Sequence, residues 1–145
     1  MFRHILLSTD GSPLANGAVD KGLDLARETG AQVTVVTAAE PFHLFWADSD
    51  EIGRSKAEHD RRAREEAAGI LAEVEAKAKA AGVACHTVLA EGQEPYRAII
   101  DVAGRAGCDL IAMASHGRRG VAAVLLGSQT TKVLTHSSLP VLVYR

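Results

Sequence analysis

The sequence predicts an α/β domain with an open sheet of five parallel strands and helices on both faces of the sheet. Five short apolar segments alternate with segments of helical character along the 145 residues. Alternation of this kind implies right-handed crossovers, which make the strands parallel and cover both faces of the sheet. A chain of this length buries about 68–70% of its unfolded surface, so residues 1–145 are expected to form one domain.

An apolar run and a turn mark the first strand and the first helix. The run covers residues 2–9 and ends at Asp10-Gly11-Ser12-Pro13. Ser12 is a typical N-cap residue, and proline fits the first helical position because no backbone N–H has to be satisfied there. The helix is expected to end at Gly30, because glycine readily closes a helix in the left-handed conformation.

The second strand covers residues 33–38, which are rich in β-branched side chains. An irregular segment follows from residue 41 to about residue 53, and it carries Phe42, Phe45 and Trp46. Such a cluster either covers a ligand or subunit contact or fills space under a long crossover. The second interpretation is favoured, because loops often fold over small apolar clusters.

A long amphipathic helix is predicted from Ser55 to Ala81. Small or apolar residues recur at intervals of three and four, at Ala63, Ala67, Ile70, Val74, Ala78 and Ala81. The remaining positions alternate in charge, which is typical of a solvated outer face rather than a partner-binding surface.

The second half of the chain continues the alternation. We expect a third strand over residues 83–89, a helix whose inner face carries Tyr96, Ile99, Ile100 and Ala103, and a fourth strand over residues 109–114. A last helix begins near Ser128, and residues 140–144 form the terminal strand.

The loop after the fourth strand has the composition of a phosphate site. Gly117 and Gly120 lack a Cβ, so they allow left-handed φ values and a close approach of anionic oxygens to main-chain N–H groups. Gly127-Ser128 opens the next helix, whose first turn offers unpaired donors and a positive dipole end. The alternative is a flexible loop before a capped helix, and the loop by itself does not separate the two. If the first and fourth strands are neighbours, this loop meets the turn at Asp10.

Composition and charge argue against several classes of protein. Lys and Arg total 16 against 18 for Asp and Glu, which leaves no broad basic surface for nucleic acid. The longest apolar run, residues 121–126, is far too short to span a membrane, and the first residues do not form a signal peptide. Cys85 and Cys108 are far apart and the histidines do not cluster, so neither a disulfide nor a metal site is expected. These features favour a cytoplasmic protein.

Several motifs together resemble the universal stress protein family over the whole chain. The ATP-binding signature of that family is Gly-x2-Gly-x9-Gly-Ser/Thr, and Gly117, nine further residues and Gly127-Ser128 match it. Residues 5–12, 131–134 and 139–143 also resemble the family's first strand and terminal segment. One departure is Ala114, which occupies the place of the first signature glycine. A methyl group there is harmless if φ is negative and costs about 1 kcal/mol or more if φ is positive.

The resemblance implies a Rossmann-like sheet of the adenine nucleotide alpha hydrolase type, with strand order 3-2-1-4-5. It also implies a site for ATP, or for AMP or ADP, with or without Mg²⁺. Adenine and ribose would lie near Thr9, Asp10, Ala38 and Met113, and the phosphates against Ala114, His116, Gly117, Gly127, Ser128, Gln129 and Thr130. Asp10 would accept from a ribose hydroxyl or the adenine amino group, and the hydroxyls of Ser128 and Thr130 would add donors.

Each of these residues also has a structural interpretation. Asp10 could organise the turn before Ser12, Ser128 could be an N-cap, and Ala38 and Met113 could belong to the core. Arg118 and Arg119 are second-rank candidates for phosphate contacts, because adjacent loop arginines are as often merely solvated.

Enzyme classes fit less well, and no catalytic residue is assigned. The ATP-pyrophosphatase loop requires paired glycines that residues 8–12 lack, and no P-loop motif occurs. A hydrolase built on Ser115, His116 and Asp10 is disfavoured, because adjacent residues at a strand end should point to opposite faces.

The main alternative is an interaction protein without nucleotide. Residues 141–144 would form an exposed apolar edge, so a homodimer through this strand is expected, as the family resemblance also implies. With nucleotide, the ligand is expected to act as a regulatory switch on a stress-response protein rather than as a substrate for turnover.

Overall fold

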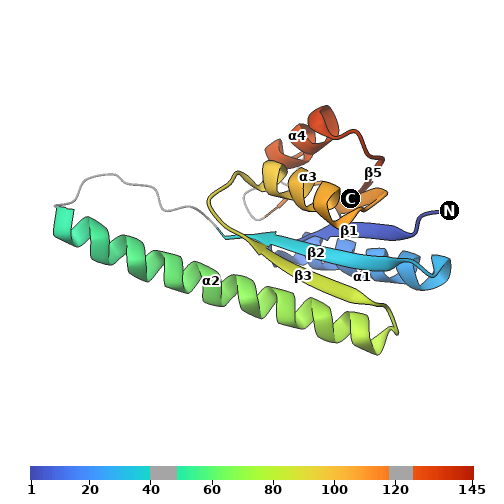
Figure 1. Ribbon diagram of the computed structural model, residues 1–145, viewed down its shortest axis with the longest axis horizontal. Helices are drawn as coiled ribbons and strands as arrows, with labels where there is room; N and C mark the ends of the chain where they lie inside the picture. Colours follow the sequence, from blue (N-terminus) through green and yellow to red (C-terminus); the bar gives the residue numbers. More distant parts are fainter. Residues whose placement is uncertain (40–48, 118–125) are drawn as a thin grey trace.

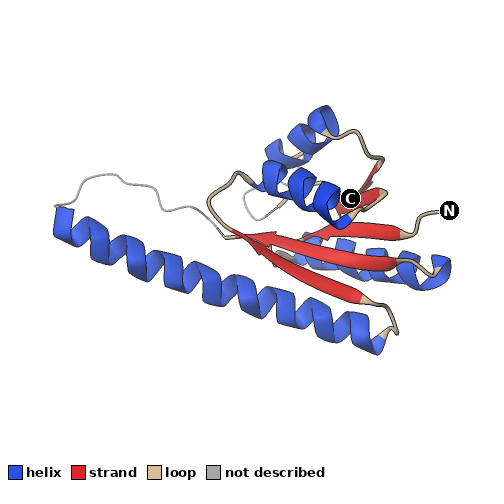
Figure 2. Cartoon of the chain, in the orientation of Figure 1, coloured by secondary structure: helices blue, strands red, loops and turns tan. Residues whose placement is uncertain are grey.

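A computed structural model describes residues 1–39, 49–117 and 126–145 of the chain (Figure 1). Its five strands form one parallel sheet in the order β3-β2-β1-β4-β5, which confirms the predicted fold class (Figure 2). The strands are β1 (His4–Ser8), β2 (Gln32–Ala38), β3 (Cys85–Ala90), β4 (Leu110–Ala114) and β5 (Val141–Tyr144). The helices are α1 (Pro13–Thr29), α2 (Ser49–Ala80), α3 (Pro95–Ala106) and α4 (Ser128–His136).

Two apolar layers hold the helices on opposite faces of the sheet. The layer under α1 and α2 contains Val19 and Leu23 of α1 and Val74 of α2, packed on alternate strand residues such as Ile5 and Leu7. The layer under α3 and α4 contains Ile99, Ala103 and Val133, packed on residues that include Leu6, Val36 and Met113. The interior strands are therefore apolar on both faces, as a doubly covered parallel sheet requires.

The turn between β1 and α1 follows the prediction. Ser12 is the N-cap of α1, and its side chain accepts a hydrogen bond from the backbone N–H of Ala15. Pro13 begins the helix, and Gly30 closes it with φ 71°. Gly11 has φ 79°, a conformation that costs glycine nothing, so the chain can turn sharply where β1 ends.

Helix α2 is longer than the sequence indicates. The predicted start was Ser55, whereas the helix begins at Ser49, so Gly53 lies inside it and not in the preceding loop. One glycine costs a helix interior only about 1 kcal/mol, which is too little to end a helix of this length. In Figure 1 the first part of α2 extends beyond the sheet. The aromatic cluster Phe42, Phe45 and Trp46 lies outside the described residues.

Four strands begin later than predicted, β4 and β5 by one residue and β1 and β3 by two. The backbone N–H of Val83 donates to the carbonyl of Ala78, and Gly82 has φ 71°, so residues 81–83 close α2 before β3 begins at Cys85. The first strand begins at His4 and not at Phe2.

The predicted start of the last helix at Ser128 is confirmed. Among the described helices, none has the length and apolar character needed to cross a membrane.

Candidate functional site

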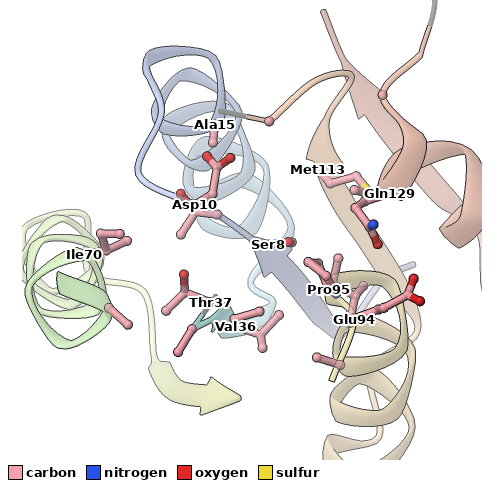
Figure 3. Close-up of a pocket in the computed structure, with 18 of the residues that line it drawn as sticks. Ser8, Asp10, Ala15, Val36, Thr37, Ile70, Glu94, Pro95, Met113 and Gln129 are labelled. Atoms are coloured by element: carbon pink, nitrogen blue, oxygen red, sulfur yellow. The ribbon is translucent and has the colours of Figure 1, made fainter. Parts of the chain in front are cut away.

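A pocket of about 720 Å³ opens at the carboxyl ends of the strands, as expected for an open parallel sheet (Figure 3). All eleven residues that the resemblance assigned to a nucleotide site line it. They come from the ends of β1, β2 and β4 and from the first turn of α4. The volume is in the range of pockets that hold small-molecule ligands. β1 and β4 are hydrogen-bonded neighbours, so the two loops converge as predicted.

The turn after β1 is held by its own side chains. Asp10 Oδ1 accepts a hydrogen bond from the backbone N–H of Ser12 at 2.9 Å, and Thr9 Oγ1 accepts from Gly11 at 3.1 Å. Both residues also line the pocket. The structural interpretation of Asp10 is therefore correct, and its carboxylate nevertheless lies at the pocket wall.

Gly117 does not use the left-handed conformation that glycine allows. Its φ lies outside the left-handed region, in contrast to Gly11 and Gly30. A side chain at this position would displace Asp10, because a Cβ on Gly117 would lie 2.6 Å from Asp10 Oδ2. The absence of a side chain at Gly117 therefore lets the loop after β4 approach the turn after β1 while the Asp10 carboxylate keeps its position. Gly120, like Arg118 and Arg119, lies outside the described residues.

The N-terminus of α4 is open toward the pocket. Gly127 is the N-cap, with φ −59° and ψ 154°, and no side chain of the described residues caps the helix. The first intrahelical bond runs from the N–H of Thr131 to the carbonyl of Gly127, so the N–H groups of Ser128, Gln129 and Thr130 have no partner within the helix. Ser128 is thus not the N-cap, contrary to the structural alternative.

Gln129 and Thr130 connect the pocket to its surroundings. Gln129 Oε1 accepts from the backbone N–H of Tyr96 at 3.0 Å and so serves as the cap that α3 lacks from Glu94. The hydroxyl of Thr130 is buried and donates to the carbonyl of Ala114 at 3.0 Å. The predicted role of this hydroxyl as a donor to phosphate does not fit that geometry, which leaves the backbone N–H of Thr130 as its contribution.

Ala114 is accommodated without strain. It is the last residue of β4, paired with Tyr144 of β5, so its backbone is extended. Its methyl group packs with Ala15 and Ala18 of α1. The conformational cost that a positive φ would impose does not arise in a strand.

Ser115 and His116 interact, although their adjacency in the chain argued against it. Ser115 Oγ lies 2.9 Å from His116 Nδ1. The expected opposite orientation fails because β4 has already ended at Ala114. Ser115 is nevertheless buried and does not line the pocket, so it is not presented as a nucleophile. His116 lines the pocket, and its Nε2 is buried with no hydrogen-bond partner among the described residues.

Sequence reasoning missed two walls of the pocket. One is the face of α2 that includes His59, Arg62 and Ile70, and the other is the entry to α3 at Gln93, Glu94 and Pro95, joined by Lys132 of α4. The order of the elements could have indicated both walls. The entry to α3 follows the carboxyl end of β3, and α2 is the crossover helix that leads from β2 to β3. Figure 3 shows Ile70 facing Glu94 and Pro95 across the pocket. Among residues 1–39, 49–117 and 126–145, no group of three His, Cys, Asp or Glu side chains could hold a metal ion.

Comparison with known proteins gives the family. The sequence model described as "Universal stress protein family" matches residues 1–145. The chain belongs to the universal stress protein family. Among curated members, it is 35% identical over 147 residues to a universal stress protein of Thermus aquaticus, and 31% identical over 153 residues to YxiE of Bacillus subtilis. Both alignments cover 100% of this chain and of the relative.

Solved structures of the family share the fold. Universal stress protein UspA from Lactobacillus plantarum superimposes with a TM-score of 0.86 at 21% identity, over 99% of this chain and 97% of that one. A universal stress protein in complex with cAMP gives a TM-score of 0.72 at 26% identity, over 99% and 97% of the two chains.

Proposed function

We propose that this universal stress protein binds an adenine nucleotide, ATP in the first instance, in the pocket at the carboxyl ends of its strands. The observation that carries the proposal is the open N-terminus of α4 at one end of an otherwise largely apolar pocket. Three backbone N–H groups without intrahelical partners and the positive end of the helix dipole suit an anionic phosphate. Binding of cAMP by a relative of the same fold supports the choice of an adenine nucleotide.

The rest of the pocket suits a base and a ribose. Val36, Ala38 and Met113 supply apolar contacts for a planar ring, and the carboxylate of Asp10 can accept from a ribose hydroxyl. His116 Nε2, which is buried and has no hydrogen-bond partner in the part of the chain that the structure describes, supports the same conclusion, since a buried ring nitrogen normally has one. In this proposal the ligand acts as a regulator, and no role as a nucleophile is given to Ser115, whose hydroxyl lies 2.9 Å from His116 Nδ1 but which does not line the pocket.

Replacing Ser128 by proline tests the helix terminus directly. Proline is tolerated at the first helical position, and the ψ of 154° at Gly127 suits a residue before proline. Ser128→Pro therefore removes one N–H from the proposed phosphate site and leaves α4 intact. Ser128→Ala is the matched control, since it removes only the hydroxyl.

Calorimetric titration of nucleotide-stripped protein with ATP, with and without Mg²⁺, gives the result. We expect saturable binding by the parent and binding about tenfold weaker in Ser128→Pro, the effect of one hydrogen bond to a charged group. Folded parent protein that binds no adenine nucleotide at millimolar concentration would overturn the proposal and favour the nucleotide-free interaction module.

The edge strand β5 supports a homodimer. It ends the strand order, so within the described residues one of its edges has no strand partner, and Leu142 is 36% exposed there. An apolar edge of this kind is commonly covered by a second copy of the chain. Light scattering after size exclusion should give a dimer for the parent and a monomer for Leu142→Asp, whereas a monomeric parent at micromolar concentration would contradict the pairing.

We also propose that nucleotide binding shifts this dimer or its surface between two states, in a protein of the cytoplasm. Cys85 and Cys108 are free thiols, which suits a reducing compartment. A ligand shifts a conformational equilibrium by its difference in affinity for the two states. Hydrogen exchange and dimerisation should therefore change when ATP is added. Identical exchange with and without bound ATP would leave the nucleotide a ligand without a regulatory effect.

A further inference from the structure

An ion pair spans the pocket wall between α3 and α4. Lys132 Nζ lies 3.0 Å from Glu94 Oε2, and both residues line the pocket. Lys132 follows Ser128 by four residues, so it stands one helical turn above the N-terminus of α4 on the same face of the helix. A chain of phosphates that starts at this N-terminus can reach the ammonium group.

Neighbouring groups hold Lys132 in a defined place. Its Nζ lies 5.3 Å from the centre of the Tyr96 ring, a distance at which an ammonium is attracted to the ring face. The backbone N–H of Tyr96 is bonded to Gln129 Oε1, which ties the entry of α3 to α4 independently of the ion pair. Lys132 can therefore change partner while the two helices keep their positions.

Lys132 can leave Glu94 at little cost. The two side chains are 43% and 54% exposed, and exposed ion pairs contribute little to stability. The hydrogen bond from Lys132 lowers the pKa of Glu94, and the charge of Arg97 lowers it further. Glu94 is also the N-cap of α3, where the helix dipole favours a negative charge. The carboxylate thus keeps compensating interactions when the lysine moves.

We propose that Lys132 distinguishes nucleoside di- and triphosphates from monophosphates by leaving Glu94 and binding the terminal phosphates. This inference rests on the proposed nucleotide site. A terminal phosphate carries more charge than one carboxylate and presents more acceptor oxygens, so it competes successfully for the ammonium group. A monophosphate at the N-terminus of α4 ends before Lys132, and the ion pair with Glu94 stays in place.

Three variants separate this role from a general effect of charge. Lys132→Gln removes the ammonium, and Glu94→Gln removes the carboxylate that competes with phosphate. Lys77→Gln is the matched control, because Lys77 forms an ion pair of similar exposure with Asp20, 2.8 Å long, away from the pocket. The dissociation constants of AMP, ADP and ATP are measured by calorimetry for each protein, at low and at high salt.

We expect Lys132→Gln to bind ATP about five- to tenfold more weakly and AMP within about twofold of the parent. Glu94→Gln should bind ATP more tightly and AMP unchanged, and Lys77→Gln should match the parent. The salt dependence of ATP binding should become shallower in Lys132→Gln alone.

The outcomes distinguish this inference from the proposed function. A parent that binds none of the three nucleotides overturns the proposed function itself. A parent that binds them, with an ATP-to-AMP affinity ratio that Lys132→Gln leaves unchanged, overturns the role of Lys132 and leaves the nucleotide site standing. Equal weakening of AMP and ATP also overturns it, because Lys132 would then act on the first phosphate.

Discussion

Asp10 Oδ2 lies 2.6 Å from the point where a Cβ on Gly117 would stand. The two residues are far apart in the sequence, and the pairing of β1 with β4 brings them together. The carboxylate that could meet a ribose and the glycine of the signature are therefore parts of one contact. A side chain at Gly117 acts on the pocket through Asp10.

Gly117→Ala should weaken nucleotide binding by an order of magnitude while costing the fold less than about 1 kcal/mol. The new methyl group meets the end of a side chain, which can rotate away, so little strain remains in the protein. Asp10 then loses its position at the pocket wall and its bond to the N–H of Ser12. Titration with ATP and urea unfolding measure the two effects separately.

Gly104→Ala is the control for this prediction. Gly104 lies in α3, and a Cβ there would meet nothing within 4 Å. Its binding should equal that of the parent, and its stability should be the same or higher because alanine favours a helix. If Gly117→Ala bound ATP as well as Gly104→Ala does, Asp10 would have no part in binding.

Gly127→Ala, in contrast to Gly117→Ala, should destabilise the fold, with a loss of about 1–3 kcal/mol in the free energy of unfolding. A Cβ at this position would lie 3.2 Å from the carbonyl oxygen of Ser115 and 3.4 Å from Cα of His116. Backbone atoms cannot rotate aside, and the N–H of Gly127 is itself bonded to that carbonyl at 2.7 Å. Urea unfolding measures the loss, and Gly17→Ala, with open space around its Cβ, is the control. Equal stability of the two variants would contradict the prediction.

The sequence predicted most of the fold because local signals and global topology agree in this chain. The apolar runs with β-branched residues became the strands, and Ser12, Pro13 and Gly30 bound α1 as their types require. The meeting of the two loops followed from the adjacency of β1 and β4, because both loops leave the carboxyl ends of these neighbouring strands.

The sequence could not predict features that depend on tertiary contacts. Gly117 leaves room for the carboxylate of Asp10 and has no positive φ, and this contact between distant residues has no local sequence pattern. Gln129 serves α3 rather than its own helix, and Lys132 pairs with Glu94 across 38 positions of sequence. Helix α2 begins before the predicted Ser55, because one glycine at position 53 costs too little to end a helix of this length.

The stability of the protein should fall as the pH drops below about 6.5, the ordinary pKa of histidine. His4 is 9% exposed, and its Nε2 lies 2.7 Å from Thr34 Oγ1. Burial and the charge of His86 lower its pKa, and the charge of Asp109 opposes them only in part. The folded state thus binds a proton at His4 less readily than the unfolded state, so the stability present above pH 6.5 is lost as the pH falls toward the lowered pKa.

Thermal unfolding between pH 7.5 and 5.0 measures this dependence. His4→Gln keeps a polar group near Thr34 and removes the titration, so its melting temperature should fall less than that of the parent over this range. Parallel curves for the parent and His4→Gln would assign the pH dependence to other groups.

Cys108 should resist alkylation in the folded protein, whereas Cys85 should react first. Cys108 is 6% exposed, and burial raises the pKa of its thiol to about 11, although a hydrogen bond with Thr34 opposes the rise. Only about 0.1% of such a thiol is the reactive thiolate at pH 8, and solvent access is also lost. Burial raises the pKa of Cys85 as well, but this residue is only half-buried at the edge strand β3.

Iodoacetamide labelling followed by peptide mass spectrometry measures the two rates, and Cys85→Ser isolates Cys108. Labelling of Cys108 in that variant should accelerate with urea in step with unfolding, and rapid labelling without urea would show that the interior between β4 and α3 opens in the native state.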